Sequence, residues 1–317
     1  MKLLKLVPDN TNLDFMRWRN FALILSILIT AASIALVATK GLNLGIDFVG
    51  GQVVRTNFAQ PVNIEDLRKR VDALELGEAS IQQLSDAKTY QVRLPKPEGA
   101  DSAASAAVTK LRTMIQRDYP GARVDAGESV SGKVSGELAW DGALAIALAM
   151  LGIAIYIWIR FEWQFGVGAL VTLFHDVAMT LGFFSLTGLQ VDLNVVAAIL
   201  TIVGYSLNDT VVIYDRIREN LRKYRKMAIV PLINMSLNET LSRTLVTSLS
   251  IMLALLLLLL LGPDVIFALT AAVLLGIFIG TYSSIYISSP ILVWLGVKPD
   301  SFLKTDEPAP GTRPQEV

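Results

Sequence analysis

The sequence has no cysteine and a single histidine, His175. Without cysteine the chain can form no disulfide, zinc thiolate, iron–sulfur cluster or cysteine nucleophile. A single histidine excludes a histidine-rich metal site, and a Ser-His-Asp hydrolase would depend on His175 alone. We therefore expect no metal and no cofactor.

Charge is also scarce, and it is balanced. Charged residues make up 18% of the 317 residues, with 28 Lys and Arg against 28 Asp and Glu, whereas hydrophobic residues make up 53%. A net charge of zero leaves no positive excess to neutralise phosphates, which excludes nucleic acid as a partner. The high hydrophobicity excludes a disordered chain. The distribution of the apolar residues indicates a membrane protein.

Six apolar segments are long enough to cross a bilayer, which takes about 20 mostly apolar residues. The first apolar run is longer than the core of a signal peptide, so we interpret it as a span. We expect a tail at 1–20, an external segment at 40–138, a second tail at 296–317, and transmembrane helices at 21–39, 139–159, 165–186, 193–214, 241–261 and 266–295.

The positions of Lys and Arg in the short loops predict the orientation. Both tails and the loops after the second and fourth spans contain basic residues, whereas Thr187–Asp192 and Gly262–Val265 contain none. We therefore expect both termini in the cytoplasm and residues 40–138 in the periplasm.

Residues 51–131 are expected to form a small α+β domain. Their patterns alternate between strand and helix in the order β-α-β-β-α-β, which is that of a ferredoxin-like fold. The expected elements are Gly51–Phe58, Ile64–Leu74, Ser80–Leu84, Thr89–Leu94, Ala103–Tyr119 and Ala122–Val130. Gly127–Val134 nearly matches a phosphate-binding loop but lacks its final hydroxyl residue, so we interpret it as a linker.

Polar residues within the apolar segments are the functional candidates, because a charge at mid-membrane costs about 2.5–3.5 kcal/mol. Gly204 lies one helical turn before Asn208, which predicts the close approach of a neighbouring helix. The candidates are His175 and Asp176 in the third span, Asn208, Asp209 and Thr210 in the fourth, and Arg243 at the start of the fifth.

Asp209 and Arg243 are the candidate pair for handling protons. A carboxyl group in a low dielectric binds a proton more readily, and a nearby guanidinium opposes this. Relative movement of the two would switch proton binding, and the membrane potential supplies about 2.3 kcal/mol per charge per 100 mV. A purely structural role is the alternative for each candidate. Asp209 would then hydrogen-bond a neighbouring helix, Arg243 would extend to the lipid headgroups, and His175 and Asp176 would share an internal hydrogen bond.

Several motifs together resemble one family. They are Gly45-Ile-Asp47-Phe48-Val-Gly50-Gly51, Arg160-Phe161-Glu162-Trp163, Phe174-His175-Asp176, Gly204–Val212 running into Asp215–Glu219, and Leu241–Thr244. Over about residues 13–295 the chain resembles SecF, the smaller membrane subunit of the bacterial SecD–SecF complex, which is similar to half of an RND-type transporter.

The resemblance implies an accessory subunit of the Sec translocase in the bacterial inner membrane, and not an enzyme. It implies that SecD completes a twelve-helix assembly and that the complex uses the proton-motive force to assist preprotein translocation and release in the periplasm. The implied partners are SecD, the SecYEG channel, translocating preproteins and protons, with YajC and YidC as further candidates.

The resemblance also assigns residues. Asp209 is implied to be the membrane carboxyl of the proton path and Arg243 its basic companion, while His175 and Asp176 receive no role. Gly50 and Gly51 are expected to shape the turn after the first span. Asp47 either caps that turn or contacts SecD.

Two other functions compete with this one. The first is half of a proton-driven exporter of small molecules or lipids, but such exporters carry large paired external domains. The second is a membrane-embedded enzyme, which would need a carboxylate pair that only Asp176 and Asp209 could form.

Overall fold

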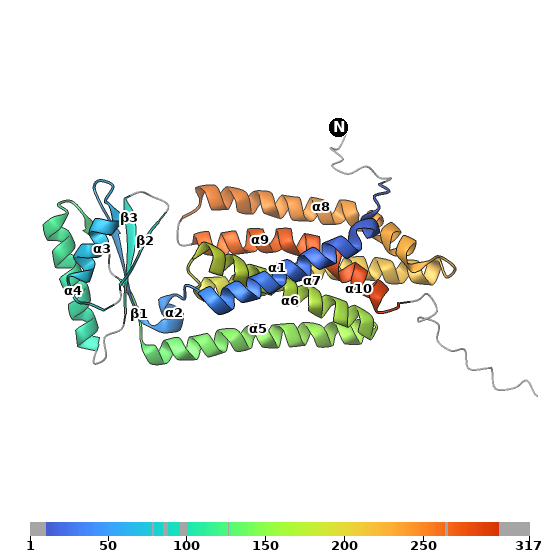
Figure 1. The fold of residues 1–317 in the computed structure, drawn as a ribbon, viewed down its shortest axis with the longest axis horizontal. Coiled ribbons are helices and arrows are strands. Elements are labelled where there is room, and N and C mark those ends of the chain that lie inside the picture. Colours follow the sequence, from blue (N-terminus) through green and yellow to red (C-terminus); the bar gives the residue numbers. More distant parts are fainter. Residues whose placement is uncertain are drawn as a thin grey trace, which may run out of the picture.

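The computed structural model describes residues 11–77, 79–84, 88–95, 101–125, 127–263 and 266–297. Long helices form a bundle, and a small sheet domain lies at one end of it (Figure 1). The first and last described residues lie at the opposite end. We call these two ends of the bundle the sheet end and the terminal end.

Among the described residues, six helices are long and apolar enough to cross a membrane, which confirms the expected polytopic fold. A short 3-10 turn, η1 (Phe15–Trp18), leads into the first helix. The long helices are α1 (Arg19–Lys40), α5 (Gly132–Arg160), α6 (Trp163–Thr187), α7 (Leu193–Lys223), α8 (Ile229–Leu261) and α9 (Phe267–Ser283). A π-helical turn, η3 (Ser284–Ser288), and α10 (Ser289–Trp294) continue α9.

Helix α8 is longer than the membrane requires. Its 33 residues span about 50 Å, against a hydrocarbon core of about 30 Å. It begins at Ile229, ahead of the expected span 241–261. The side-chain amides of Asn234 and Asn238 in this extra part bond the backbone of Phe15 and Leu13. The extra part of α8 therefore fixes the segment that precedes α1.

The inner helices of the bundle are α6, α7 and α9. In the most apolar window of each, 56%, 44% and 61% of the residues are buried, against 11% in α5 and in α8. Helices α5 and α8 lie at opposite edges of the bundle (Figure 1). Polar side chains on the buried faces of these three helices are therefore shielded from lipid.

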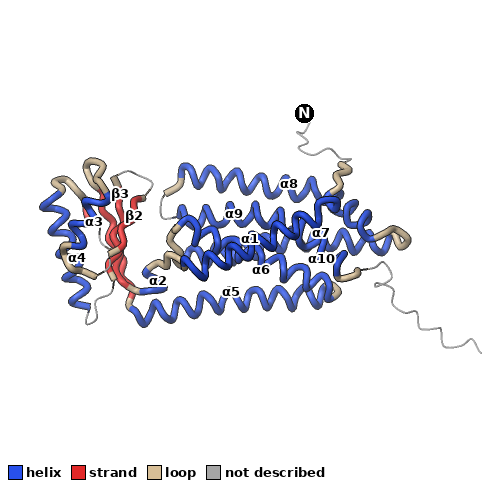
Figure 2. The backbone as a smooth tube through the Cα atoms, viewed as in Figure 1, coloured by secondary structure: helices blue, strands red, loops and turns tan. Residues whose placement is uncertain are grey.

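The sheet domain has the expected ferredoxin-like strand order. Helices α3 and α4 cover the face of the sheet that points away from the bundle (Figure 2). The sheet order is β2-β3-β1-β4, and every pair is antiparallel. The elements are β1 (Gly51–Asn57), α3 (Ile64–Asp72), β2 (Ser80–Gln83), β3 (Thr89–Leu94), α4 (Asp101–Asp118), β4 (Arg123–Val124) and β5 (Glu128–Val130), with a short helix α2 (Ile46–Val49) before β1.

The last strand differs from the expectation. A single strand at Ala122–Val130 is wrong, because two short strands, β4 and β5, both pair with β1. Val124 pairs with Thr56 and Glu128 pairs with Val53, so the register against β1 shifts by one residue between β4 and β5. A shift of this kind is typical of a β-bulge, which breaks the ladder and increases the local twist.

Candidate functional site

Asp176 is the centre of a buried hydrogen-bond network between the inner helices. Its side chain, on α6, is inaccessible to solvent. Its Oδ2 accepts from the Ser206 hydroxyl of α7 at 2.5 Å and the Ser283 hydroxyl of α9 at 3.0 Å. A buried carboxylate is tolerated where hydrogen bonds replace its water. The network therefore joins α6, α7 and α9 at a charged group.

His175 reaches this network through one ring nitrogen. Its Nδ1 lies 2.9 Å from Oδ1 of Asp176. An ionised carboxylate can only accept, so Nδ1 carries the ring proton in that state. The other nitrogen, Nε2, is buried and has no hydrogen-bond partner among the described residues. The internal hydrogen bond considered from the sequence is thus present, but it leaves half of the imidazole unsatisfied.

Further hydroxyl pairs line the contact between α7 and α9. Thr210 of α7 lies 2.8 Å from Ser284, the first residue of the π-helical turn. Nearer the sheet end, the Ser248 hydroxyl of α8 lies within 3.0 Å of both the Tyr205 and the Thr281 hydroxyls. Single π-helical turns often occur at functional sites. A polar column therefore runs along the inner helices.

Small residues let these two helices approach. A methyl group added at Gly276 of α9 would clash with Ile202 of α7, and one at Gly280 would lie 3.0 Å from Cβ of Ser206. These glycines belong to a run of small residues at four-residue spacing, namely Ala272, Gly276, Gly280, Ser284 and Ser288. Such a run is a known signal for membrane helix packing. The polar column was not predicted from the sequence, and this run is the signal that could have located it.

Asp209 is buried on α7, with 3% of its surface exposed. Its Oδ2 has no hydrogen-bond partner in the part of the chain that the structure describes. Arg243 of α8 is exposed, and its charge acts on the Asp209 carboxyl. No ion pair within 4.0 Å joins the two among the described residues. The carboxylate is therefore buried and incompletely paired within this chain.

Asn208 and Gly204 lie on a different face of α7. Both are exposed, as are Thr201 and Asp215 of the same face. No described residue outside its own helix would come within 4 Å of a methyl group added at Gly204. The neighbouring helix expected at this face therefore does not belong to the described part of this chain. A polar stripe of α7 is left uncovered.

The Gly45–Gly51 segment connects the sheet domain to the start of α7. Oδ2 of Asp47 accepts from the backbone N–H of Leu193 at 3.0 Å, so Asp47 contacts the N-terminus of α7. The Gly45 N–H donates to the Val191 carbonyl at 2.7 Å. Gly50 and Gly51 have φ values of 74° and 119°, which glycine adopts without strain. Phe48 packs against the core at the sheet end.

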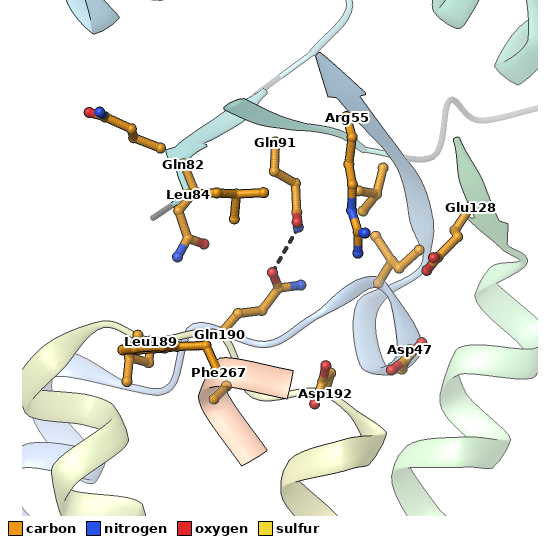
Figure 3. A pocket seen from close by; sticks show the side chains of 14 residues that line it. Asp47, Arg55, Gln82, Leu84, Gln91, Glu128, Leu189, Gln190, Asp192 and Phe267 are labelled. Carbon is orange, nitrogen blue, oxygen red and sulfur yellow. Dashed lines mark hydrogen bonds between the residues drawn. The ribbon is translucent and has the colours of Figure 1, made fainter. Parts of the chain in front are cut away.

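A cleft of about 310 Å³ lies between the sheet and the bundle, beside this segment. Figure 3 shows Asp47, Arg55 and Asp192 around it, with Gln91 of β3 pointing toward Gln190 of the α6–α7 loop. The two amides share a hydrogen bond of 2.9 Å. Strand β3 is thereby tied to the same loop that Gly45 bonds.

The Arg160–Trp163 turn fixes the terminal end of the bundle. Phe161 is buried, and its ring meets Tyr214 of α7 edge-on at 6.2 Å. Glu162 lies 3.6 Å from Arg218, whereas Trp163 is exposed. Arg160 lies 3.2 Å from the Asp215 carboxylate. The turn thus anchors α5 and α6 to the part of α7 that follows Asp209.

Two family models match the chain. A model described as "Protein export membrane protein SecD/SecF, C-terminal" matches residues 110–298, and one described as "SecD/SecF GG Motif" matches residues 35–62. The second match covers the segment that joins the sheet domain to α7.

Relatives match over most of the chain. The SecF protein translocase subunit of Rhodobacter capsulatus is 41% identical over 93% of this chain and 92% of that protein. The SecDF subunit of Brucella abortus is 41% identical, over 93% of this chain and 39% of the longer protein. The crystal structure of SecDF from Thermus thermophilus, a translocon-associated membrane protein, matches with a TM-score of 0.84 and 35% identity over 92% of this chain. This chain spans 39% of that longer one.

In the described part of the chain, six apolar helices, a sheet domain at one end of the bundle and ionisable residues inside the bundle define a multi-pass membrane transport component. With the matches above, the class becomes specific. The chain belongs to the SecF family, the accessory subunits of the Sec translocase that assist protein export at the bacterial inner membrane. Members of this family are transport components and not enzymes. Their relation to SecDF, in which a longer chain contains the SecF part, indicates SecD as a partner.

Proposed function

We propose that this chain, together with SecD, couples the proton-motive force to the translocation and release of preproteins, with Asp209 as the carboxyl that binds and releases the proton. The burial of Asp209 with one oxygen unpaired carries the proposal. Such a group is expensive inside a membrane, and a carboxylate kept there for packing alone would be fully hydrogen-bonded.

Arg243 is the proposed companion of Asp209. It begins the apolar part of α8, and its guanidinium is exposed and acts on the carboxyl without touching it. A gap between the two charges leaves room for approach and separation. In the proposal, approach of Arg243 favours the ionised carboxylate and separation favours proton uptake.

SecD is proposed to cover the uncovered stripe of α7. The stripe consists of Thr201, Gly204, Asn208 and Asp215. Polar and small residues facing lipid are unfavourable, whereas the same residues let a second helix approach closely and bond across the contact. Because Asp209 neighbours Asn208, SecD would lie beside the proton-binding carboxyl. The path is then complete only in the complex.

The orientation follows from the loops. Basic residues gather in the loops of the terminal end, and the loops of the sheet end other than the domain itself lack them. In the proposal, the terminal end lies in the cytoplasm and the domain at residues 40–138 lies in the periplasm. There it would meet polypeptides that leave the SecYEG channel, with YajC and YidC as further neighbours.

The decisive test replaces Asp209 with Asn in cells that lack the native protein. Asp209→Asn keeps the shape and cannot ionise. We expect export of a secreted reporter to collapse while abundance and SecD association stay normal. Glu219→Gln is the matched control, because it removes an exposed carboxylate from the terminal end of the same helix, and it should keep export. Normal export by Asp209→Asn would refute the proton-binding role.

A further inference from the structure

We propose that His175 and Asp176 form a second proton-binding site, in which Nε2 of His175 takes a proton delivered by water and Asp176 carries the balancing charge. This site rests on the proposed proton coupling and adds a step to it. Ser206 connects the site to α7 one turn before Asp209. A movement of α7 would therefore change the surroundings of both sites.

The geometry leaves one atom free to react. Nδ1 of His175 is engaged by Asp176, so the tautomer is fixed with the lone pair on Nε2. Only 5% of the His175 side chain is exposed, and its Nε2 has no hydrogen-bond partner among the described residues. An unpaired polar atom in an interior is costly. A water molecule that reaches Nε2 would gain a hydrogen bond there and could transfer a proton to this nitrogen.

The charge balance favours this chemistry. Hydroxyls of Ser206 and Ser283 donate to Asp176, whose oxygens act as acceptors. With neutral His175 the pair carries one negative charge in a low dielectric. A proton on Nε2 converts it into an imidazolium and a carboxylate with no net charge, which burial tolerates better.

The surrounding helices supply one other charge at this depth. Helix α1 has no charged residue between Arg19 and Lys40, α5 has none between Asp141 and Arg160, and α9, η3 and α10 have none. Between Asp192 and Asp215, α7 has only Asp209. These elements also contain tyrosines, namely Tyr156, Tyr205, Tyr214, Tyr282 and Tyr286. Asp209 is therefore the other carboxyl of these helices at this depth, and Arg243 of α8 acts on it.

The step is a simple transfer. An O–H bond of a hydronium ion breaks as the N–H bond at Nε2 forms, and no electrons are exchanged with a redox partner. Release reverses this transfer and returns the proton to water, so the proton is conserved.

The single histidine makes the site directly observable. The chain can be labelled with 15N-histidine, purified through a tag that contains no histidine, and assembled with unlabelled SecD in lipid vesicles. Every labelled signal then comes from His175. We expect the Nε2 resonance to change from the lone-pair to the protonated form as the vesicles are acidified. An Nε2 signal that stays constant on acidification would overturn the proposal.

Proton uptake by variants distinguishes a proton-binding role of His175 from a structural role, and distinguishes this site from the Asp209 site. His175→Asn keeps an amide donor toward Asp176 and removes Nε2. We expect normal abundance and SecD association but proton uptake into the vesicles that is slower by about a hundredfold, the lower range for a positioned proton-transfer group. Thr172→Val is the matched control, because it removes a buried hydroxyl of α6 that bonds the Gly168 carbonyl of its own helix, and its uptake should remain within a few-fold of wild type.

The outcomes differ for the two proposals. Loss of uptake in Asp209→Asn together with wild-type uptake in His175→Asn would refute the second site and leave the proposed function intact. Full uptake in Asp209→Asn would refute the proposed function. Equal losses in Thr172→Val and His175→Asn would assign the effect to the packing of α6 and also overturn the second site.

Discussion

The carboxylate of Asp47 accepts a hydrogen bond from the backbone N–H of Leu193 across 146 residues of sequence, at 3.0 Å. Leu193 begins the helix that carries Asp209. Asp192, the residue before it, caps the same helix by accepting from Val195. Two carboxylates thus meet the positive end of the α7 dipole. The Gly45–Gly51 segment is therefore a support of α7 as well as a turn into β1.

We expect Asp47→Ala to weaken this support. Loss of a side-chain cap costs ~1 kcal/mol, so the sheet-end turn of α7 should exchange its amide hydrogens about fivefold faster, because 1.4 kcal/mol corresponds to tenfold. Hydrogen exchange followed by mass spectrometry of the purified complex measures this. Asp47→Asn keeps an acceptor oxygen and should exchange at nearly the wild-type rate. Unchanged exchange in Asp47→Ala would show that Asp192 alone holds the helix end.

The contact of Gly276 with Ile202 leads to a second prediction. A side chain at Gly276 must push α9 away from α7, and overpacking of this kind costs about 1–3 kcal/mol. We expect Gly276→Ala to lower the midpoint of thermal unfolding in detergent. Gly152→Ala is the matched control, since no described residue outside its own helix lies within 4 Å of that position. Alanine there should be neutral or stabilising, because glycine is the weaker helix former. Equal midpoints for both variants would contradict the close packing.

The sequence predicted the six spans and the strand order because both depend on patterns within a segment. Apolar runs of membrane length and alternating strands need no knowledge of what they pack against. The break between β4 and β5 escaped prediction for the opposite reason. A bulge depends on the register against β1, which is a distant segment.

The site was predictable in its residues and not in its connections. Burial cost singled out His175, Asp176 and Asp209. Nothing in their spacing shows that Ser206 and Ser283, from two other helices, donate to Asp176. The alternatives for Asp47 were the local turn and SecD, whereas its partner is the end of α7. Long-range contacts of this kind follow from the packing of helices, which a single sequence does not encode locally.

A third prediction concerns acid. The Arg117 guanidinium, hydrogen-bonded to Asp118, holds the pKa of that carboxyl below its usual value of 3.8, and Arg70 adds a second contact at 2.7 Å. A lowered pKa in the folded state means that the unfolded chain binds more protons. The stability from this cluster is therefore present above about pH 4 and is lost as the pH falls through the folded pKa.

The acid prediction can be measured by protection of α3 and α4 amides from hydrogen exchange as the pH is lowered. Wild-type protection should fall on acidification, after correction for the intrinsic pH dependence of exchange. Asp118→Asn should start lower at neutral pH and change less with acid. The exposed Arg68–Glu65 pair of α3 supplies the control, since Glu65→Gln should have little effect. Identical profiles for wild type and Asp118→Asn would refute the assignment.

The last prediction concerns the uncovered stripe of α7. If SecD packs on it, Gly204→Leu should hold the two helices apart, because small residues allow close approach in membranes. Asn208→Leu should cost about 1 kcal/mol by removing an interhelical hydrogen bond. We expect SecD recovered with the tagged chain to fall in both variants, and further for Gly204→Leu.

Gly152→Leu on the outer helix α5 provides the control, because it adds the same side chain to another exposed glycine. It should leave SecD recovery unchanged. If it reduces recovery as much as Gly204→Leu does, the effect comes from added bulk at the lipid surface and not from a contact at α7. Normal recovery in both α7 variants would place SecD against another face, and the proton-binding carboxyl of Asp209 would then lie away from the partner that is proposed to complete its path.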